Sequence, residues 1–312
     1  MKKIVRDTLL IFITFITLSC SKDNDYTEIQ KNVYAVGYES NGNKNVATLW
    51  KNGFATYLTD GGNNAVASSV TVVNNDVYVA GSEANSKSIA KVWKNGVVTD
   101  LTDGTQNAFV SAISVADNNI YAVGFESNGN KNVAKLWKNG VPTNLTDGTE
   151  HARANAVTVV NNNVYVAGME YNSSKYVATI WKNNVALQLT DGTQNAAAHS
   201  VAITNDDVYV LGKEYNGNNN VSKVWKNEVA TDLTDGTNHT HAHSLKVVNN
   251  DVYIVGFEDI DGITVAVLWK NGIATDLTNG TQPANALSVT VFNNEVYVAG
   301  FEKNGNKFVA KI

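Results

Sequence analysis

Several common features are missing from this sequence, and each absence narrows what the protein can be. Cys20 is the only cysteine, so no intramolecular disulfide can form. Lysine and arginine are spread along the chain and form no basic stripe, which argues against nucleic-acid binding. No segment shows helical periodicity. No Ser-His-Asp arrangement, pair of catalytic carboxylates or metal signature stands out. We therefore predict a protein that is not an enzyme and needs no cofactor.

What the sequence does contain is a repeat. An apolar run that ends in glycine, followed one residue later by glutamate, occurs seven times, first at residues 33–39 (VYAVGYE). Successive copies of its glycine are 43 or 44 residues apart. A fixed period in this range is typical of an array, a solenoid or a propeller. The landmark glycines are Gly37, Gly81, Gly124, Gly168, Gly212, Gly256 and Gly300.

One copy, residues 107–148, shows what each repeat contains. Strands are predicted at 112–115, 120–126, 133–137 and 141–145, separated by polar turns and one Asn-Gly pair. The second strand is apolar on both faces, as expected for a sheet packed between two neighbours. Four antiparallel strands per period of about 44 residues make one blade of a β-propeller.

Seven copies predict a seven-bladed, all-β propeller of four-stranded antiparallel blades over residues 33–312. Residues 26–29 match the first strand of the first blade weakly. The sequence stops at Ile312, before the outermost strand of the seventh copy, so the last blade is predicted to lack that strand. Either the N-terminal segment fills the gap, or the blade keeps an open edge.

A tryptophan ends the third strand of six copies. One interpretation is a set of aromatic platforms for sugars. The interpretation that we favour is blade-to-blade packing, because one residue at the same position in every copy is what a shared packing slot requires. These residues are Trp50, Trp93, Trp137, Trp181, Trp225 and Trp269.

The order of strands in each copy resembles that of kelch-type propellers. The run IYAVGFE at 120–126 is followed by a strand ending in an aromatic residue and then by an outer strand. We describe the repeats at 33–312 as kelch-like or tachylectin-like. The resemblance implies the propeller fold and assigns no particular family.

The N-terminus resembles that of a bacterial lipoprotein. A basic start leads into an apolar run at 8–18 (TLLIFITFITL), which is too short to span a bilayer, and Cys20 follows closely. The resemblance implies a signal peptide at 1–19, lipidation of Cys20 and a polar tether at 20–32. The sequence SKDND after the cysteine is similar to the surface-export signal of Bacteroidota lipoproteins. We therefore expect an exported protein held in the outer membrane by its lipid, at the cell surface or, alternatively, facing the periplasm.

The longer polar loops all lie at one end of the blades, because alternate turns of a meander share a face. Functional residues concentrate on such loops over a rigid scaffold, so this long-loop face is the candidate binding face. Two acidic positions recur there, and they form either rings of ligand sites or carboxylates that accept backbone N–H bonds and fix their loops. They are Glu39, Glu83, Glu126, Glu170, Glu214, Glu258 and Glu302, and Asp60, Asp103, Asp147, Asp191 and Asp235, with Asn279 in the sixth copy.

All five histidines precede or begin the first strand of copies four to six, and His151 is one of them. His239, His241 and His243 alternate, so in an extended chain they share one side. They could hold a metal or an anion near the axial mouth, or they could be polar lining of a water-filled channel. We predict no metal site; His199, His241 and His243 are only weak candidates for metal ligands. The predicted ligand-binding residues are Arg153, Asn155, His199, His239, His241 and His243.

Three functions are compatible with these patterns. The first, which we favour, is a surface-tethered, non-enzymatic binding or scaffold lipoprotein that engages a glycan or a protein through the long-loop face. The second is an extracellular propeller hydrolase or lyase, and the third is a purely structural or adhesive surface protein. We expect a monomer that touches the membrane only through its lipid.

Overall fold

The computed structural model describes residues 32–312, and the compact unit that they form runs from Val33 to Ile312. The predicted signal peptide, Cys20, most of the tether and the weak first-strand match at 26–29 lie outside the described residues. Within the described part the secondary structure is β-strand throughout, 26 strands in all. No helix there is long and apolar enough to cross a membrane.

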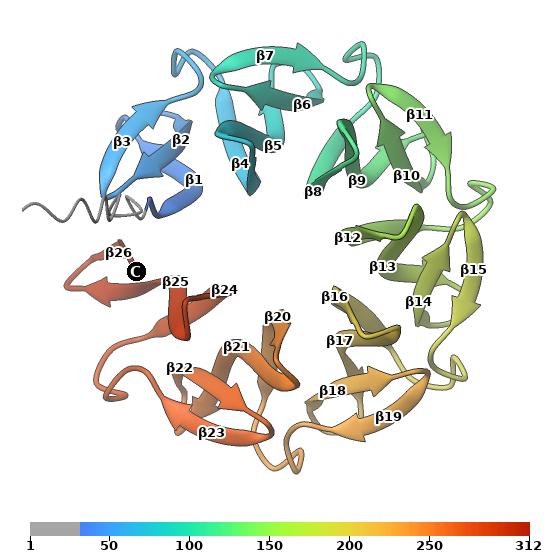
Figure 1. Cartoon of the computed structure of the whole chain (residues 1–312), viewed down its shortest axis with the longest axis vertical. Coiled ribbons are helices and arrows are strands. Elements are labelled where there is room, and N and C mark those ends of the chain that lie inside the picture. Colours follow the sequence, from blue (N-terminus) through green and yellow to red (C-terminus); the bar gives the residue numbers. More distant parts are fainter. Residues whose placement is uncertain (1–31) are drawn as a thin grey trace, which may run out of the picture. The chain divides into compact units, whose positions relative to one another are not determined.

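Seven antiparallel sheets are arranged in a ring, as Figure 1 shows, which confirms the seven-bladed propeller. Blades two to six have four strands each, joined in chain order from the inside to the outside. These are β4 (Asn64–Val73), β5 (Asp76–Ala84), β6 (Ser88–Lys94) and β7 (Val97–Asp100); β8 (Ala108–Ala116), β9 (Asn119–Ser127), β10 (Asn132–Lys138) and β11 (Val141–Asn144); β12 (Ala152–Val160), β13 (Asn163–Tyr171), β14 (Tyr176–Lys182) and β15 (Val185–Gln188); β16 (Ala196–Thr204), β17 (Asp207–Tyr215), β18 (Asn220–Lys226) and β19 (Val229–Asp232); β20 (Thr240–Val248), β21 (Asp251–Ile260), β22 (Ile263–Lys270) and β23 (Ile273–Asp276).

The two blades at the ends of the described chain have three strands each. Blade one contains β1 (Tyr34–Ser40), β2 (Asn45–Lys51) and β3 (Phe54–Tyr57). Blade seven contains β24 (Ala284–Phe292), β25 (Glu295–Asn304) and β26 (Lys307–Lys311). The predicted three-stranded last blade is therefore confirmed. Blade one starts at its second strand within the described residues.

Short turns with left-handed residues connect the strands at one end of each blade. Asn139 and Gly140, between β10 and β11, both have positive φ values, 51° and 81°. Asp117 and Asn118, between β8 and β9, have φ of 47° and 59°. Asparagine, aspartate and glycine tolerate this conformation, and it matches the twist of a hairpin. The predicted Asn-Gly turn is thus confirmed.

The core lies between blades. Trp137 of β10 is fully buried in a cluster with Tyr78 and Ala90 of the preceding blade. Five of the six tryptophans are at most 2% exposed, so they are packing residues and not sugar platforms. Only Trp50 of blade one is partly exposed. These five are Trp93, Trp137, Trp181, Trp225 and Trp269.

The innermost strands are longer than the sequence indicated. The strand predicted at 112–115 is part of β8, which begins at Ala108. Its first half is missed because a β-bulge between Val110 and Ala112 interrupts the alternation of side chains that a strand prediction relies on. Inner strands β4, β8, β12, β16, β20 and β24 lie nearest the centre of the ring (Figure 1).

Candidate binding site at the inner strands

A β-bulge occurs at the same position of every described inner strand. In β16, for example, the pairing with β17 shifts between Ala198 and Ser200, so His199 has no partner across the ladder. A bulge redirects the side chain of its extra residue. Across the six inner strands the bulged residues are Ser68, Ser111, Asn155, His199, His243 and Leu287.

Some bulged residues reach the next inner strand. The Ser68 hydroxyl donates a hydrogen bond to the carbonyl of Val110, at 2.6 Å, and the Asn155 amide donates to the carbonyl of Ala198, at 2.8 Å. Each bond joins neighbouring blades through backbone that faces the ring axis. Asn155, which the sequence proposes as a ligand-binding residue, therefore has a structural partner for its NH2 group.

Two bulged histidines and one further histidine form a cluster across blades five and six. The Nε2 atoms of His199 and His241 are 3.1 Å apart, so one ring donates a hydrogen bond and the other accepts it. The ring centroids of His241 and His243 are 4.3 Å apart. We call His199, His241 and His243 the histidine cluster. The sequence proposed these three residues, and the fold brings them together.

Burial keeps the histidine cluster neutral at physiological pH. It lowers the pKa of His199 from its ordinary value of 6.5 to about 3, and the nearby Lys213 and His243 lower it further. It also lowers the pKa of His241 to about 2 and that of His243 to about 4. Each ring therefore carries one nitrogen with a free electron pair at pH 7.

Residues that the sequence reasoning missed surround the cluster. Lys213 of β17 acts electrostatically on all three rings, and burial lowers its own pKa. Phe257 of β21 lies 6.0 Å from the rings of both His241 and His243, measured between centroids. Two buried polar atoms there have no hydrogen-bond partner: Nε2 of His243 and Oδ1 of Asn285. Buried polar atoms are rarely left unpaired.

Aromatic and cationic groups meet in the adjoining blades three and four. The guanidinium of Arg153 lies 4.7 Å above the ring of Phe125, and Phe109 stacks on that ring at 5.2 Å. Arg153 is exposed, and Phe109 is 38% exposed. Arg153 is therefore accessible, as a ligand-binding residue must be, but it belongs to a different cluster from the histidines.

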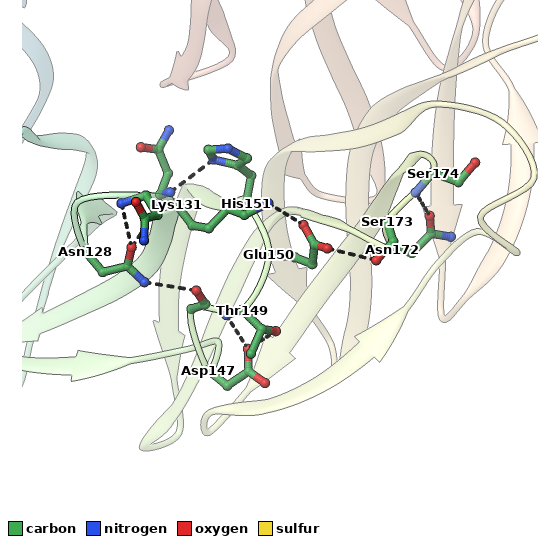
Figure 2. Close-up of polar contacts among 12 residues, drawn as sticks. Asn128, Lys131, Asp147, Thr149, Glu150, His151, Asn172, Ser173 and Ser174 are labelled. Atoms are coloured by element: carbon green, nitrogen blue, oxygen red, sulfur yellow. Dashed lines mark hydrogen bonds and ion pairs between the residues drawn. The ribbon is translucent and has the colours of Figure 1, made fainter.

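The remaining two histidines have other surroundings. His239 is exposed, just before β20, with its ring 6.2 Å from that of Phe257. Nδ1 of His151 accepts a hydrogen bond from the backbone N–H of Asn132, at 3.1 Å, and so helps to hold a loop (Figure 2). In the described residues no group of three or more His, Cys, Asp or Glu side chains is arranged to hold a metal ion.

The aspartates of the long loops fix their own turns. Asp147 Oδ1 accepts hydrogen bonds from the backbone N–H and the hydroxyl of Thr149, at 2.9 and 2.7 Å (Figure 2). These bonds hold the pKa of Asp147 below its usual value. Asn279 accepts the same two bonds from Thr281 without a charge. The structural interpretation of this ring is therefore the correct one.

The glutamates at the ends of the second strands do not bind backbone N–H groups, although the structural interpretation expected this. Their partners are side chains and not backbone N–H groups: Glu126 pairs with Lys135 at 2.7 Å, and Glu39 accepts from the hydroxyl of Tyr57 at 3.0 Å. The reason is geometric, because the strand pairing places a lysine of the third strand beside the glutamate in several blades. Glu170 lies opposite no lysine, and burial raises its pKa.

Neighbouring long loops are also joined to each other. Glu150 pairs with Lys131 of the preceding blade at 2.9 Å and accepts a hydrogen bond from the hydroxyl of Ser173 at 2.8 Å (Figure 2). Asn128 holds its own loop and donates to the carbonyl of Gly148 at 2.9 Å. The long-loop face of blades three and four is thus a connected, well-defined surface.

Comparison with known proteins finds likeness in fold only. No protein-family model matches the sequence, and no curated protein matches it. The β-propeller domain of the Trilobed protease from Pyrococcus furiosus, described as having an open velcro topology, superposes with a TM-score of 0.56 at 11% identity, over 89% of each chain. The acylaminoacyl peptidase of Pyrococcus horikoshii superposes with a TM-score of 0.51 at 11% identity, over 89% of this chain and 50% of the peptidase. At this identity the comparison shows a shared β-propeller fold.

Proposed function

We propose that this chain is a non-enzymatic binding propeller that engages a glycan or a protein at the mouth formed by its inner strands on the long-loop face. The proposal rests on the positions at which the repeats differ from one another. Three positions per blade vary widely in chemistry: the residue two before the bulge, the bulged residue, and the residue after the landmark glycine. The first and third are cross-strand partners, as Phe109 and Phe125 are.

We call these the mouth positions. In blades two to seven they hold Val66, Ser68 and Ser82; Phe109, Ser111 and Phe125; Arg153, Asn155 and Met169; Ala197, His199 and Lys213; His241, His243 and Phe257; Asn285, Leu287 and Phe301.

Positions beside them hardly vary. The residue before the bulge is alanine in five of these six strands, with Val110 as the exception. The strand-two tyrosine is constant from Tyr78 to Tyr297. Packing positions shared by all blades must stay alike, because each blade presents the same slot to its neighbour. Positions released from that constraint and gathered near the axis are suited to recognising a ligand that is not sevenfold symmetric.

The chemistry of the mouth positions suits a polar ligand with apolar faces. Phe109 and Arg153 offer an exposed apolar and cationic surface above the buried ring of Phe125, and the half-buried histidine cluster offers neutral donors and acceptors. Sugars and peptide segments combine such faces with hydroxyl or amide groups. The lipid anchor at Cys20 and the surface location stay part of the proposal, supported by the N-terminal sequence alone.

The hydrolase alternative is supported by one observation, that both superposed propellers come from peptidases. Half of the acylaminoacyl peptidase has no counterpart in this chain. Of the histidines described above, His151 accepts from a backbone amide and His199 pairs with His241, so neither activates a serine. We therefore favour binding.

A glycan array tests the proposal. We expect the labelled protein to bind a subset of glycans, and the double variant Phe109→Ala/Arg153→Ala to lose at least about tenfold in affinity, as when two contact residues at the centre of an interface are truncated. Val141→Ala is the matched control, because Val141 is a 66% exposed apolar residue on the outer strand of the same blade. Equal binding by the double variant would remove the mouth as the site. No binding by the unaltered protein would remove the glycan ligand.

A further inference from the structure

The histidine cluster brings two imidazole nitrogens from adjacent blades within 3.1 Å of each other. We propose that His199 and His241 form a bidentate site for a divalent transition metal, Cu²⁺ bound most tightly, with water completing the coordination. The inference goes beyond the proposed ligand binding and does not depend on it, because the metal site rests on two side chains from adjacent blades.

The distance between the two nitrogens supports this assignment. Imidazole nitrogens bind Zn²⁺ or similar ions at about 2.0–2.1 Å. With the Nε2 atoms 3.1 Å apart, an ion at that distance from both would subtend an N–metal–N angle of about 100°. That value lies between the square-planar and tetrahedral ideals, so Cu²⁺, Ni²⁺ and Zn²⁺ all fit. To bind an ion, the ring that donates must carry its proton on Nδ1 in place of Nε2, and both rings must turn so that their Nε2 electron pairs point to the ion beside the N–N line.

The strands hold both rings before any ion arrives. His199 is the bulged residue of β16, and His241 pairs with Phe257 in the ladder between β20 and β21. Each comes from a different blade, and the rings meet because the inner strands converge near the axis (Figure 1). Ligands on strands of a rigid scaffold lose little entropy when they bind an ion.

Two further polar groups adjoin the pair. Nε2 of His243 and Oδ1 of Asn285 are buried and make no hydrogen bond of good geometry, although the Asn285 side chain lies near enough to act on the His243 ring. Water molecules bound to an ion at His199 and His241 could donate hydrogen bonds to such acceptors, as outer-shell partners of metal sites do.

The donor set decides the kind of metal. Two neutral imidazoles and no carboxylate favour Cu²⁺, Ni²⁺ and Zn²⁺ over Mg²⁺ and Ca²⁺, which prefer oxygen ligands. Only two protein ligands are preformed, in agreement with the absence of a three-residue site in the described chain. The ammonium group of Lys213 acts on the cluster with a positive charge, so it opposes the binding of a cation and would favour that of an anion.

Isothermal titration of the full-length protein with CuCl2, and separately with ZnCl2, tests the inference. We expect one ion per chain, bound more tightly than about 1 mM. His199→Asn and His241→Asn should each weaken binding at least about tenfold. Asparagine occurs at both of these repeat positions in other blades, as Asn155 and Asn285, so the fold should tolerate it. His151→Asn is the matched control, because Nδ1 of this histidine in blade four only accepts the backbone N–H of Asn132, and Asn195 makes the equivalent contact in the next blade; it should bind like the unaltered protein.

Lys213→Met separates a metal site from an anion site. Removing the positive charge should tighten Cu²⁺ binding severalfold, whereas weaker binding would contradict the assignment. In the electron paramagnetic resonance spectrum, Cu²⁺ bound to the unaltered protein should show two coordinated imidazole nitrogens, and His241→Asn should remove one. Binding that is absent, or that is equally affected by His151→Asn, or that persists unchanged in both His199→Asn and His241→Asn, would overturn the proposal.

Discussion

At the scale of single residues, the landmark glycine recurs in blades two to seven because the backbone of the inner strand lies too close to it for any larger residue. A Cβ atom added to Gly124 would lie 1.9 Å from the carbonyl oxygen of Phe109 on the neighbouring inner strand. The same conflict, at 2.1 Å, recurs at Gly81, Gly168, Gly212, Gly256 and Gly300. The glycine of the landmark is therefore required by the bulged inner strand beside it and not by its own backbone conformation.

Gly124→Ala should accordingly be strongly destabilising. The inner strand would have to move, so we expect a loss of about 3 kcal/mol in the free energy of unfolding, at the upper end of overpacking effects. Urea unfolding followed by tryptophan fluorescence measures it. Gly37→Ala is the matched control, because its Cβ would meet only the Trp50 side chain, at 3.4 Å, and should cost less than about 1 kcal/mol. Equal losses in the two variants would show that backbone lies against Gly37 as closely as against the other landmark glycines.

At the scale of strands and blades, the two end blades are packed less well than the others. Val309 of β26 is 41% exposed, whereas Val265, at the same repeat position in β22, is 4% exposed. In blades two to six the inner strand packs against the preceding blade, but blade one begins at its second strand within the described residues. The side of blade seven that would meet an inner strand therefore keeps exposed apolar side chains.

Hydrogen exchange should register this difference. Backbone amides of β25 and β26 should exchange at least about tenfold faster than the matching amides of β21 and β22, because strands with few buried contacts open at lower free energy. Mass spectrometry of peptides from both blades measures it under one set of conditions, and β17 and β18 provide a second well-packed reference. Equal protection in the two blades would contradict the prediction and indicate that blade seven is covered in solution.

Most strands and turns could be predicted from the sequence, but the full inner strands and several site residues could not. The outer strands and the Asn-Gly turns depend on local residues such as Asn139 and Gly140, so their pattern is visible in the chain. The first half of β8 was missed because its bulge interrupts the alternation at Val110. Lys213, Phe257 and Asn285 were missed as site residues, although comparing the copies position by position would have marked all three as variable.

At the scale of the whole molecule, the histidine cluster makes stability depend on pH. The pKa values of His199, His241 and His243 are lowered in the folded protein relative to 6.5. Between 6.5 and the folded values, the unfolded chain therefore binds more protons than the folded one, and falling pH favours unfolding. The aspartates of the long loops, such as Asp147, act in a separate window, because their pKa values lie below 3.8 when folded.

We expect the free energy of unfolding to be constant above about pH 7 and to fall between pH 6.5 and 4.5, by up to about 1.4 kcal/mol per pH unit for each histidine. Urea unfolding at a series of pH values measures this slope. The triple variant His199→Asn/His241→Asn/His243→Asn should flatten it, while Val141→Ala, which changes an exposed residue with no titratable group, should leave it unchanged. A triple variant with the original slope would show that other groups take up the protons.

The sequence by itself determined the period, the number of blades and the turn chemistry, because each of these is written in residues close together and repeated seven times. Only the tertiary structure decided where the inner strands bulge and which side chains meet across blades. His199 and His241 are 42 residues apart in the chain, yet their Nε2 atoms are 3.1 Å apart. Such contacts depend on the distance and angle between neighbouring blades, which the packing of a whole ring sets and no single repeat contains.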